Sequence, residues 1–448
     1  MVRRRAMTKR STAGHGRSRR RVGLLLAAGL AAGPALAGCG SAVGGGPVVV
    51  RASASGSRAA VDPGQVAAVA AGTSAFGLDL LHALTATPDG AGRNVVVSPA
   101  GLASVLGMLL PGARGATAEE LAKALHTGLD PRQYALAVGA PDSGSRAGGD
   151  QVVLRRSDAL WTQQGLAVAP DYLDTLAAAF DTGVHPVDFA RDPAGARGSI
   201  NAAVEKATEG RIKELFGPRQ ITADTRLALT DALYLKAAWA SGFKPANTSE
   251  RPFHRLDGST PSVSTMSRTG TLRYAEGSGG IVGEPWQAVE LPYVGGGLAM
   301  DLIVPAQGGY AAFSKGLDQA QLDRILGGLG ERSVDLTLPR FHFDTANDLV
   351  PALRSLGVKA AFDAPDFTGI TAKEPLVLGA VVQKATVEVN EDGTVAAAGS
   401  GAGVAAMAAP AAPESVQLHI DRPFLFLIRD TADGRPLFLG QVTDPQAS

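Results

Sequence analysis

The chain has 448 residues and equal numbers of basic and acidic side chains, so its formal net charge is zero. This balance gives no indication of a nucleic-acid partner, because proteins that bind the phosphate backbone usually carry a basic excess. A single cysteine excludes an internal disulfide, and 45% hydrophobic residues are enough for a large apolar core.

The N-terminus has the pattern of an export signal. A basic region that ends at Arg21 precedes an apolar, small-residue segment at 22–37, which is short for a membrane-spanning helix. Cys39 follows in the sequence Leu36-Ala37-Gly38-Cys39, which resembles a bacterial lipobox and implies a lipid anchor on Cys39. An ordinary cleaved signal peptide is the alternative, and the Sec and twin-arginine export routes both stay open.

Residues 40–61 are small and low in complexity, which is typical of a flexible tether. The sequence therefore predicts a signal segment at 1–39, a tether at 40–61 and one domain at 62–448. We expect an extracytoplasmic protein that is lipid-anchored to the cell membrane and is either retained there or shed.

Within the domain, helical periodicity appears first at 66–84. A short buried strand at 94–99 ends in a helix start, which Ser98 can cap and which Pro99 fits. Further strands are expected at 151–163 and 227–239, and a helix at 171–180. The second of these strands carries one acid, Asp231, and an acid among apolar neighbours needs hydrogen-bond partners.

The most informative stretch begins at Lys384. Residues 384–389 are typical of a strand, a turn follows at 390–393, and residues 393–413 include no charged side chain. Strand-like sequences at 416–429 and 437–442 place this uncharged segment inside a domain rather than between domains. Alternate residues from Thr394 to Val404 are small or uncharged, so the segment could enter a sheet without burying an unpaired charge.

The sequence EVNEDGTVAAAG resembles the reactive-loop hinge of the serpins, which trap proteases by inserting the cleaved loop into their own main sheet. Other stretches, notably 335–371 and 421–445, extend the resemblance over nearly all of the chain after the tether. The resemblance implies the serpin fold, an α+β fold with three β-sheets, about eight or nine helices and an exposed reactive-centre loop.

The resemblance also implies roles for residues of the loop. Glu391 would start the hinge, and Gly393 and Thr394 would be the first residues to insert. The residues that fit the pattern of inhibitory serpins are Ala396, Ala397 and Ala398. Counting forward from Glu391 places the cleaved bond at Met407-Ala408, whereas counting back from Pro423 places it nearer Ala412. Either site offers an apolar residue, which suits an elastase-like or subtilisin-like protease better than a trypsin-like one.

Serpins usually have two serines, an asparagine and a histidine beneath the point where the main sheet opens. The matching positions here are Ser98, Gly101, Asp231 and Gln383, so three of the four differ. Because a glutamine amide can donate to a carboxylate, we expect Asp231 and Gln383 to be in contact. Trp239 matches the tryptophan near the top of the sheet, where insertion begins, and this role is compatible with plain core packing.

Enzyme signatures are missing from the sequence: it has no G-x-S-x-G or H-E-x-x-H motif, and its seven histidines are scattered. We therefore expect no catalytic residue, metal or cofactor, and a chain that is not an enzyme. The serpin resemblance implies a monomer whose partner is a serine protease, held as a covalent acyl complex. The predicted function is suicide inhibition outside the cytoplasm, and a non-inhibitory serpin that binds or carries another molecule is the alternative.

Overall fold

The computed structural model of the chain describes residues 49–52, 61–86, 88–140, 148–278, 283, 285–394 and 415–447. Several residues singled out by the sequence lie outside these ranges: Cys39, Ala396, Ala397, Ala398, Met407, Ala408 and Ala412. The described residues belong to one compact unit, 46–448.

A seven-stranded sheet carries most of the described site residues. Its strand order is β11-β12-β13-β5-β3-β4, and β2 also pairs with β5. β5 is buried along almost its whole length, which explains why its sequence is apolar without alternation. The strands are β11 (Phe341–Asp348), β12 (Leu378–Val389), β13 (Gly393–Thr394), β5 (Leu227–Ala238), β2 (Val152–Arg156), β3 (Ala159–Gln163) and β4 (His185–Val187).

The boundary between β5 and β12, called the seam below, changes along its length. The two strands are parallel and pair directly from Leu378 opposite Leu227 to Thr386 opposite Tyr234. Beyond that point β13 lies between them and is antiparallel to both: Thr394 pairs with Val389 of β12 and with Ala237 of β5. The seam is therefore closed over most of its length and occupied by β13 at one end.

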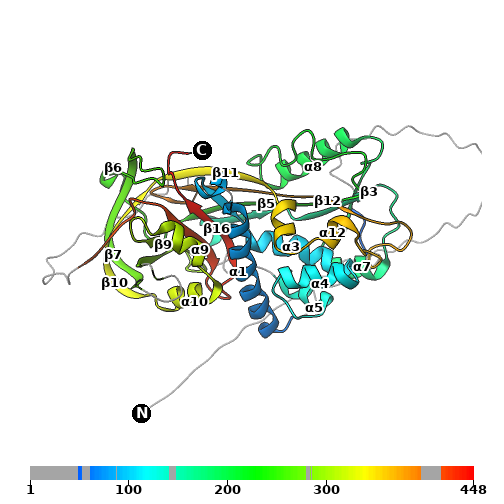
Figure 1. Cartoon of the computed structure of the whole chain (residues 1–448), viewed down its shortest axis with the longest axis horizontal. Coiled ribbons are helices and arrows are strands. Elements are labelled where there is room, and N and C mark those ends of the chain that lie inside the picture. Colours follow the sequence, from blue (N-terminus) through cyan, green and yellow to red (C-terminus); the bar gives the residue numbers. More distant parts are fainter. Residues whose placement is uncertain are drawn as a thin grey trace, which may run out of the picture. The chain divides into compact units, whose positions relative to one another are not determined.

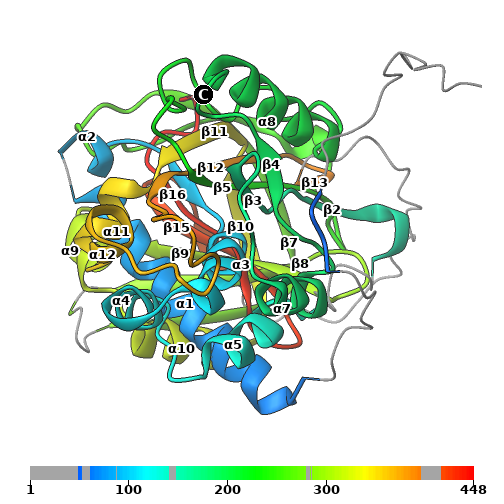
Figure 2. The same cartoon turned by 90° about the vertical axis from the view of Figure 1, so that its right-hand side faces the viewer.

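Helices cover both faces of this sheet (Figures 1 and 2). α8 (Pro193–Ala207) crosses one face, where Ile200 and Val204 pack with Ala228 and Ala232 of β5. On the other face lies α3 (Pro99–Leu109), which is buried throughout and which Ser98 caps by accepting a hydrogen bond from Gly101. The remaining helices are α1 (Pro63–Thr85), α2 (Pro88–Ala91), α4 (Gly115–Ala124), α5 (Pro131–Val138), α7 (Pro170–Phe180), α9 (Tyr310–Gly316), α10 (Gln319–Gly327), α11 (Val350–Ser355) and α12 (Ala360–Asp363).

The second sheet has nine strands, in the order β1-β16-β15-β9-β8-β7-β10-β14 with β6 paired to β7. Where the sequence analysis expected two further sheets, the hydrogen bonding is continuous, because β7 (Ser262–Gly277) pairs with β10 (Gly330–Pro339) along ten residues and also with β8. The α+β class is confirmed, with eleven α-helices among the described residues, two of them of four residues. The other strands are β1 (Val95–Val97), β6 (Ser249–Pro252), β8 (Trp286–Pro292), β9 (Leu298–Pro305), β14 (Val416–His419), β15 (Phe424–Asp430) and β16 (Pro436–Val442).

Two stretches that looked like single strands are divided. The stretch 416–429 forms β14, which pairs with β10, and β15, which pairs with β9 and β16. Pro423 separates them, because proline has no N–H to donate to a ladder. The stretch 151–163 likewise forms β2 and β3, which are separated by Ser157 and Asp158.

α1 is the one described helix that is long and apolar enough to cross a membrane, but half of its apolar window is buried in the fold. Phe76, Leu80 and Leu81 of α1 lie in the hydrophobic core, so α1 is a core helix of the fold. N-terminal to it, Val50 forms a β-bridge with Val184. Part of the segment expected to be a tether therefore contacts the fold.

Candidate functional site

Glu391, the predicted start of the hinge, is buried and held by side chains from outside the hinge. Its Oε1 accepts hydrogen bonds from Arg340 Nε, at 2.9 Å, and from Thr248 Oγ1. Burial raises the pKa of Glu391, but the hydrogen bonds from Arg340 and Thr248 outweigh burial and hold the pKa below its ordinary value. The carboxyl is therefore an anion that fixes the turn between β12 and β13.

Gly393 and Thr394 lie inside the sheet. Gly393 has a φ of +153°, and a Cβ there would lie 2.0 Å from the carbonyl oxygen of Ala237, so only glycine fits this close approach. Thr394 is 1% exposed, and its hydroxyl lies 2.6 Å from the hydroxyl of Tyr293. The two residues that the serpin resemblance assigns as the first to insert are thus paired between β5 and β12.

Trp239 lies beside the hinge, directly after β5. Its ring stacks on Tyr293, with centroids 4.6 Å apart and an angle of 8° between the planes. Its indole Nε1 donates to the carbonyl of Asn390, and its backbone N–H donates to the carbonyl of Asp392, each at 2.9 Å. Trp239 therefore both packs in the core and ties the hinge to the end of β5.

Beneath the closed part of the seam, the expected contact between Asp231 and Gln383 is present. Gln383 Nε2 donates to Asp231 Oδ2 and, at 2.8 Å, to the carbonyl of Ser98, while Gln383 Oε1 accepts from the N–H of Ser98 at 2.9 Å. All three residues are buried. A Cβ at Gly101 would lie 2.3 Å from both carboxyl oxygens of Asp231, so glycine makes room for the acid.

The sequence analysis missed Asp158, which lies on the other side of Asp231. The backbones of Ser157 and Ala232 exchange hydrogen bonds and Ala159 pairs with Thr230, so Asp158 is the cross-strand neighbour of Asp231. Arg156 Nη2 donates to Asp158 Oδ2 at 2.8 Å. The only signal in the sequence is an acid beside the apolar residues of β3.

Burial of Asp231 raises its pKa well above the ordinary value. The neighbouring charge of Asp158 raises it further, whereas the Gln383 amide and the Arg156 charge lower it. Ser98, Gly101, Asp231 and Gln383 are thus brought together at the seam, and Trp239 lies apart from them at the occupied end, beside the hinge.

Comparison with known proteins identifies the family. A family model described as "Serpin (serine protease inhibitor)" matches residues 71–445. The chain belongs to the serpin family. A serpin-like protein from Thermococcus kodakarensis is 34% identical over 390 residues, which are 86% of this chain and 87% of that protein.

The chain is also similar to a serpin whose name states an inhibitory role and to a serpin with a solved structure. Plasminogen activator inhibitor 1 from Neovison vison is 33% identical over 357 residues, which are 79% of this chain and 88% of that protein. The crystal structure of native protease nexin-1 with heparin superposes with a TM-score of 0.75 at 29% identity, and covers 85% of this chain and 100% of that chain. The serpin fold is confirmed, and the activity that the family description names is inhibition, which is not catalysis.

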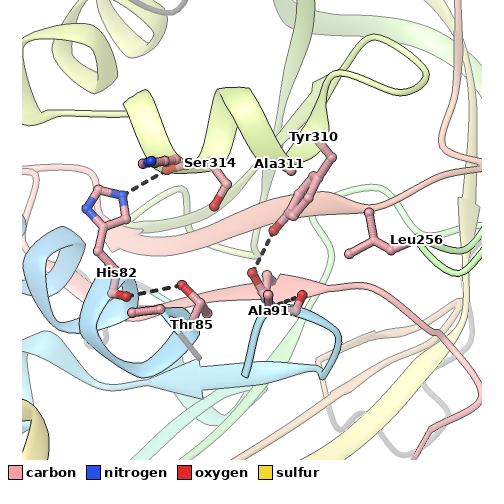
Figure 3. Close-up of a pocket in the computed structure, with 10 residues that line it drawn as sticks. His82, Thr85, Ala91, Leu256, Tyr310, Ala311 and Ser314 are labelled. Carbon is pink, nitrogen blue, oxygen red and sulfur yellow. Dashed lines mark hydrogen bonds between the residues drawn. The ribbon is translucent and has the colours of Figure 1, made fainter. Parts of the chain in front are cut away.

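A cavity of about 480 Å³ lies elsewhere in this serpin, between α1, α9 and β16 (Figure 3). Polar groups in its wall are bonded within the fold: His82 Nε2 contacts the carbonyl of Ser314 at 2.8 Å, and Tyr310 donates to Gln441 at 2.9 Å. Among the described residues no cluster of three His, Cys, Asp or Glu side chains could hold a metal ion. The hinge and seam remain the candidate functional site.

Proposed function

We propose that this serpin inhibits serine proteases by cleavage of its reactive loop and insertion of that loop into the seam. The observation that carries the proposal is β13, which lies between β5 and β12: Gly393 and Thr394 pair with β5, and Thr394 also pairs with Val389 of β12. Below β13 these two strands pair only with each other along the seam. Insertion would separate them and extend β13 as an antiparallel strand between them.

The register of β13 indicates how much of the loop would follow. Gly393 lies opposite Ala238, and the same antiparallel register continued through the proposed cleaved form would bring Val404 opposite Leu227, where β5 begins. The cleaved bond must then lie beyond residue 404 for a whole strand to form. Met407-Ala408, the bond that we propose, meets this condition, and so would a bond near Ala412. Both lie outside the described residues.

The proposed reaction begins when the serine of the protease attacks the carbonyl carbon of Met407. The peptide bond to Ala408 breaks, Ala408 leaves with a new amino group, and Met407 stays bonded to the protease as an acyl-enzyme. Insertion of the freed loop carries the protease along and distorts its oxyanion hole, so that hydrolysis of the ester stalls. The serpin supplies a bait sequence and the conformational energy released when the strand forms.

The proposed target class and the proposed location rest on the sequence alone. An apolar residue at position 407 fits the apolar binding pocket of an elastase-like or subtilisin-like protease. The proposed lipid on Cys39 would hold the inhibitor outside the cytoplasm, and the basic and apolar segments before it support this location.

Thermal unfolding before and after loop cleavage tests insertion. The purified chain is nicked within 395–414 by a protease that it does not trap, and a sample treated with inactivated protease is the control. We expect the nicked chain to unfold at a much higher temperature, because insertion adds a central strand to the seven-stranded sheet, called the main sheet below. An unchanged or lower unfolding temperature would favour a non-inhibitory serpin, the second candidate, which the unusual Gly101, Asp231 and Gln383 beneath the seam support.

A further inference from the structure

Three polar side chains form a row across the main sheet, through the closed part of the seam. Gln383 on β12 pairs with Asp231 on β5, and Asp158 is the neighbour of Asp231 on the side away from the seam. Separation of β5 from β12 would therefore remove Gln383 from Asp231 but leave the two acids together.

The row has too few donors for two carboxylates. Gln383 donates to Oδ2 of Asp231, and Arg156 donates to Oδ2 of Asp158. The Oδ1 atoms of both acids are buried and have no hydrogen-bond partner among the described atoms. Two carboxyl groups on directly opposite positions of neighbouring strands, each with a buried Oδ1 atom, cannot both ionise cheaply, and one proton shared between them supplies the missing donor.

The surroundings favour a proton on Asp231 rather than on Asp158. Asp158 forms an ion pair with Arg156, which stabilises its carboxylate. Asp231 is 1% exposed, and its hydrogen-bond donor is the neutral amide of Gln383. The backbone of Gly101 closes the site from the side of α3. The charged and titratable groups that act on Asp231 are Asp158 and Arg156.

We propose that Asp231 is a neutral carboxylic acid in the closed sheet, that it donates a hydrogen bond to the Asp158 carboxylate, and that loss of this proton favours opening of the seam. Asp158 is then a positioning residue for loop insertion. The protonation itself does not depend on inhibitory activity. Only the effect on loop insertion rests on the proposed function.

The direction of the pH effect follows from where the proton is held more tightly. Burial is the largest cause of the raised pKa of Asp231, so opening of the seam would return that pKa toward its ordinary value of about 3.9. The closed sheet is therefore favoured at low pH, and this advantage is lost as the pH rises through the raised pKa. One proton changes the ratio of closed to open forms by up to about tenfold per pH unit.

Infrared spectroscopy of the full chain tests the proton directly. We expect the carbonyl stretch of a protonated carboxylic acid at neutral pH, lost in Asp231→Asn and kept in Asp174→Asn, which replaces an exposed acid on α7. Burial also raises the pKa of Asp301, to about 6, so the band is assigned by its loss in Asp231→Asn. Absence of such a band from the unmodified chain, or its persistence in Asp231→Asn, would overturn the proposal.

Thermal unfolding between about pH 5 and about pH 9 tests the consequence. The unmodified chain and Asp174→Asn should lose stability as the pH rises, and Asp231→Asn and Asp158→Asn should lose less. If Asp231→Asn does not fold, the pH dependence of Asp158→Asn and the infrared spectrum of the unmodified chain still test the proposal. An equal pH dependence in all foldable variants contradicts the proposal. If the pH dependence is as expected but no protease is trapped, the proposed function fails and the shared proton stands.

Discussion

Under the proposed mechanism, replacement of Thr394 by arginine should turn the chain from an inhibitor into a substrate of the protease. Thr394 is 1% exposed in β13, and its hydroxyl contacts the hydroxyl of Tyr293. Arginine is always charged, and burial of an unpaired charge costs several kcal/mol. A backbone hydrogen bond contributes only about 1 kcal/mol, so the two residues of β13 cannot offset this cost, and the hinge would leave the sheet.

The assay is the number of serpin molecules consumed for each elastase molecule inhibited. Thr394→Arg should be cleaved at the same bond without forming a complex that survives denaturation. Thr394→Val is the matched control, because it keeps the size of the side chain and loses only a hydrogen bond worth about 1 kcal/mol. If Thr394→Arg forms as much covalent complex as the unmodified chain, β13 is not the start of insertion and the reasoning is refuted.

Two further substitutions test the seam and the hinge. Gly101→Ala would place a Cβ 2.3 Å from the Asp231 carboxyl oxygens, so urea unfolding should show a loss of about 1–3 kcal/mol; Gly128→Ala, which meets nothing within 4 Å, should show almost none. Arg340→Ala should lower the free energy of unfolding by about 1–3 kcal/mol, because the buried Glu391 carboxylate loses its ionic partner. The loss is not larger because Arg340 is 45% exposed and water screens the pair. Since the pKa of Glu391 is lowered, its contribution is present above the ordinary carboxyl pKa and lost as the pH falls through the lowered value. Arg340→Ala should therefore lose less stability in acid, and an unchanged acid profile would contradict the role of this ion pair.

The serpin resemblance implied the hinge role of Glu391, Gly393 and Thr394, and that role stays a prediction, but the structure shows why two of these positions tolerate few residue types. Gly393 must approach the backbone of Ala237, and Thr394 must be small enough to be buried beside Tyr293. The contact of Gln383 with Asp231 was also predictable, since a buried acid needs a donor and an amide can supply one.

The hydrogen-bonding and cross-strand partners of the hinge and seam residues could not be predicted, because the local sequence does not determine which strands pair or in which register. Asp158 meets Asp231 only because β3 pairs with β5 in one register. The second sheet shows the same limit: β7 pairs with both β8 and β10, so one continuous sheet forms where two were expected. The hydrophobic pattern alone also made residues 416–429 look like one strand, whereas β14 ends at His419 and β15 begins directly after Pro423.

The central claim, suicide inhibition, is tested most directly by mixing the purified chain with pancreatic elastase and with subtilisin. Denaturing gels report covalent complexes, and mass spectrometry of the released C-terminal peptide identifies the cleaved bond. The account predicts a band at the summed mass that survives denaturation, with cleavage after Met407. Clean cleavage of the loop without such a band, for these and for a broader panel of serine proteases, would contradict it.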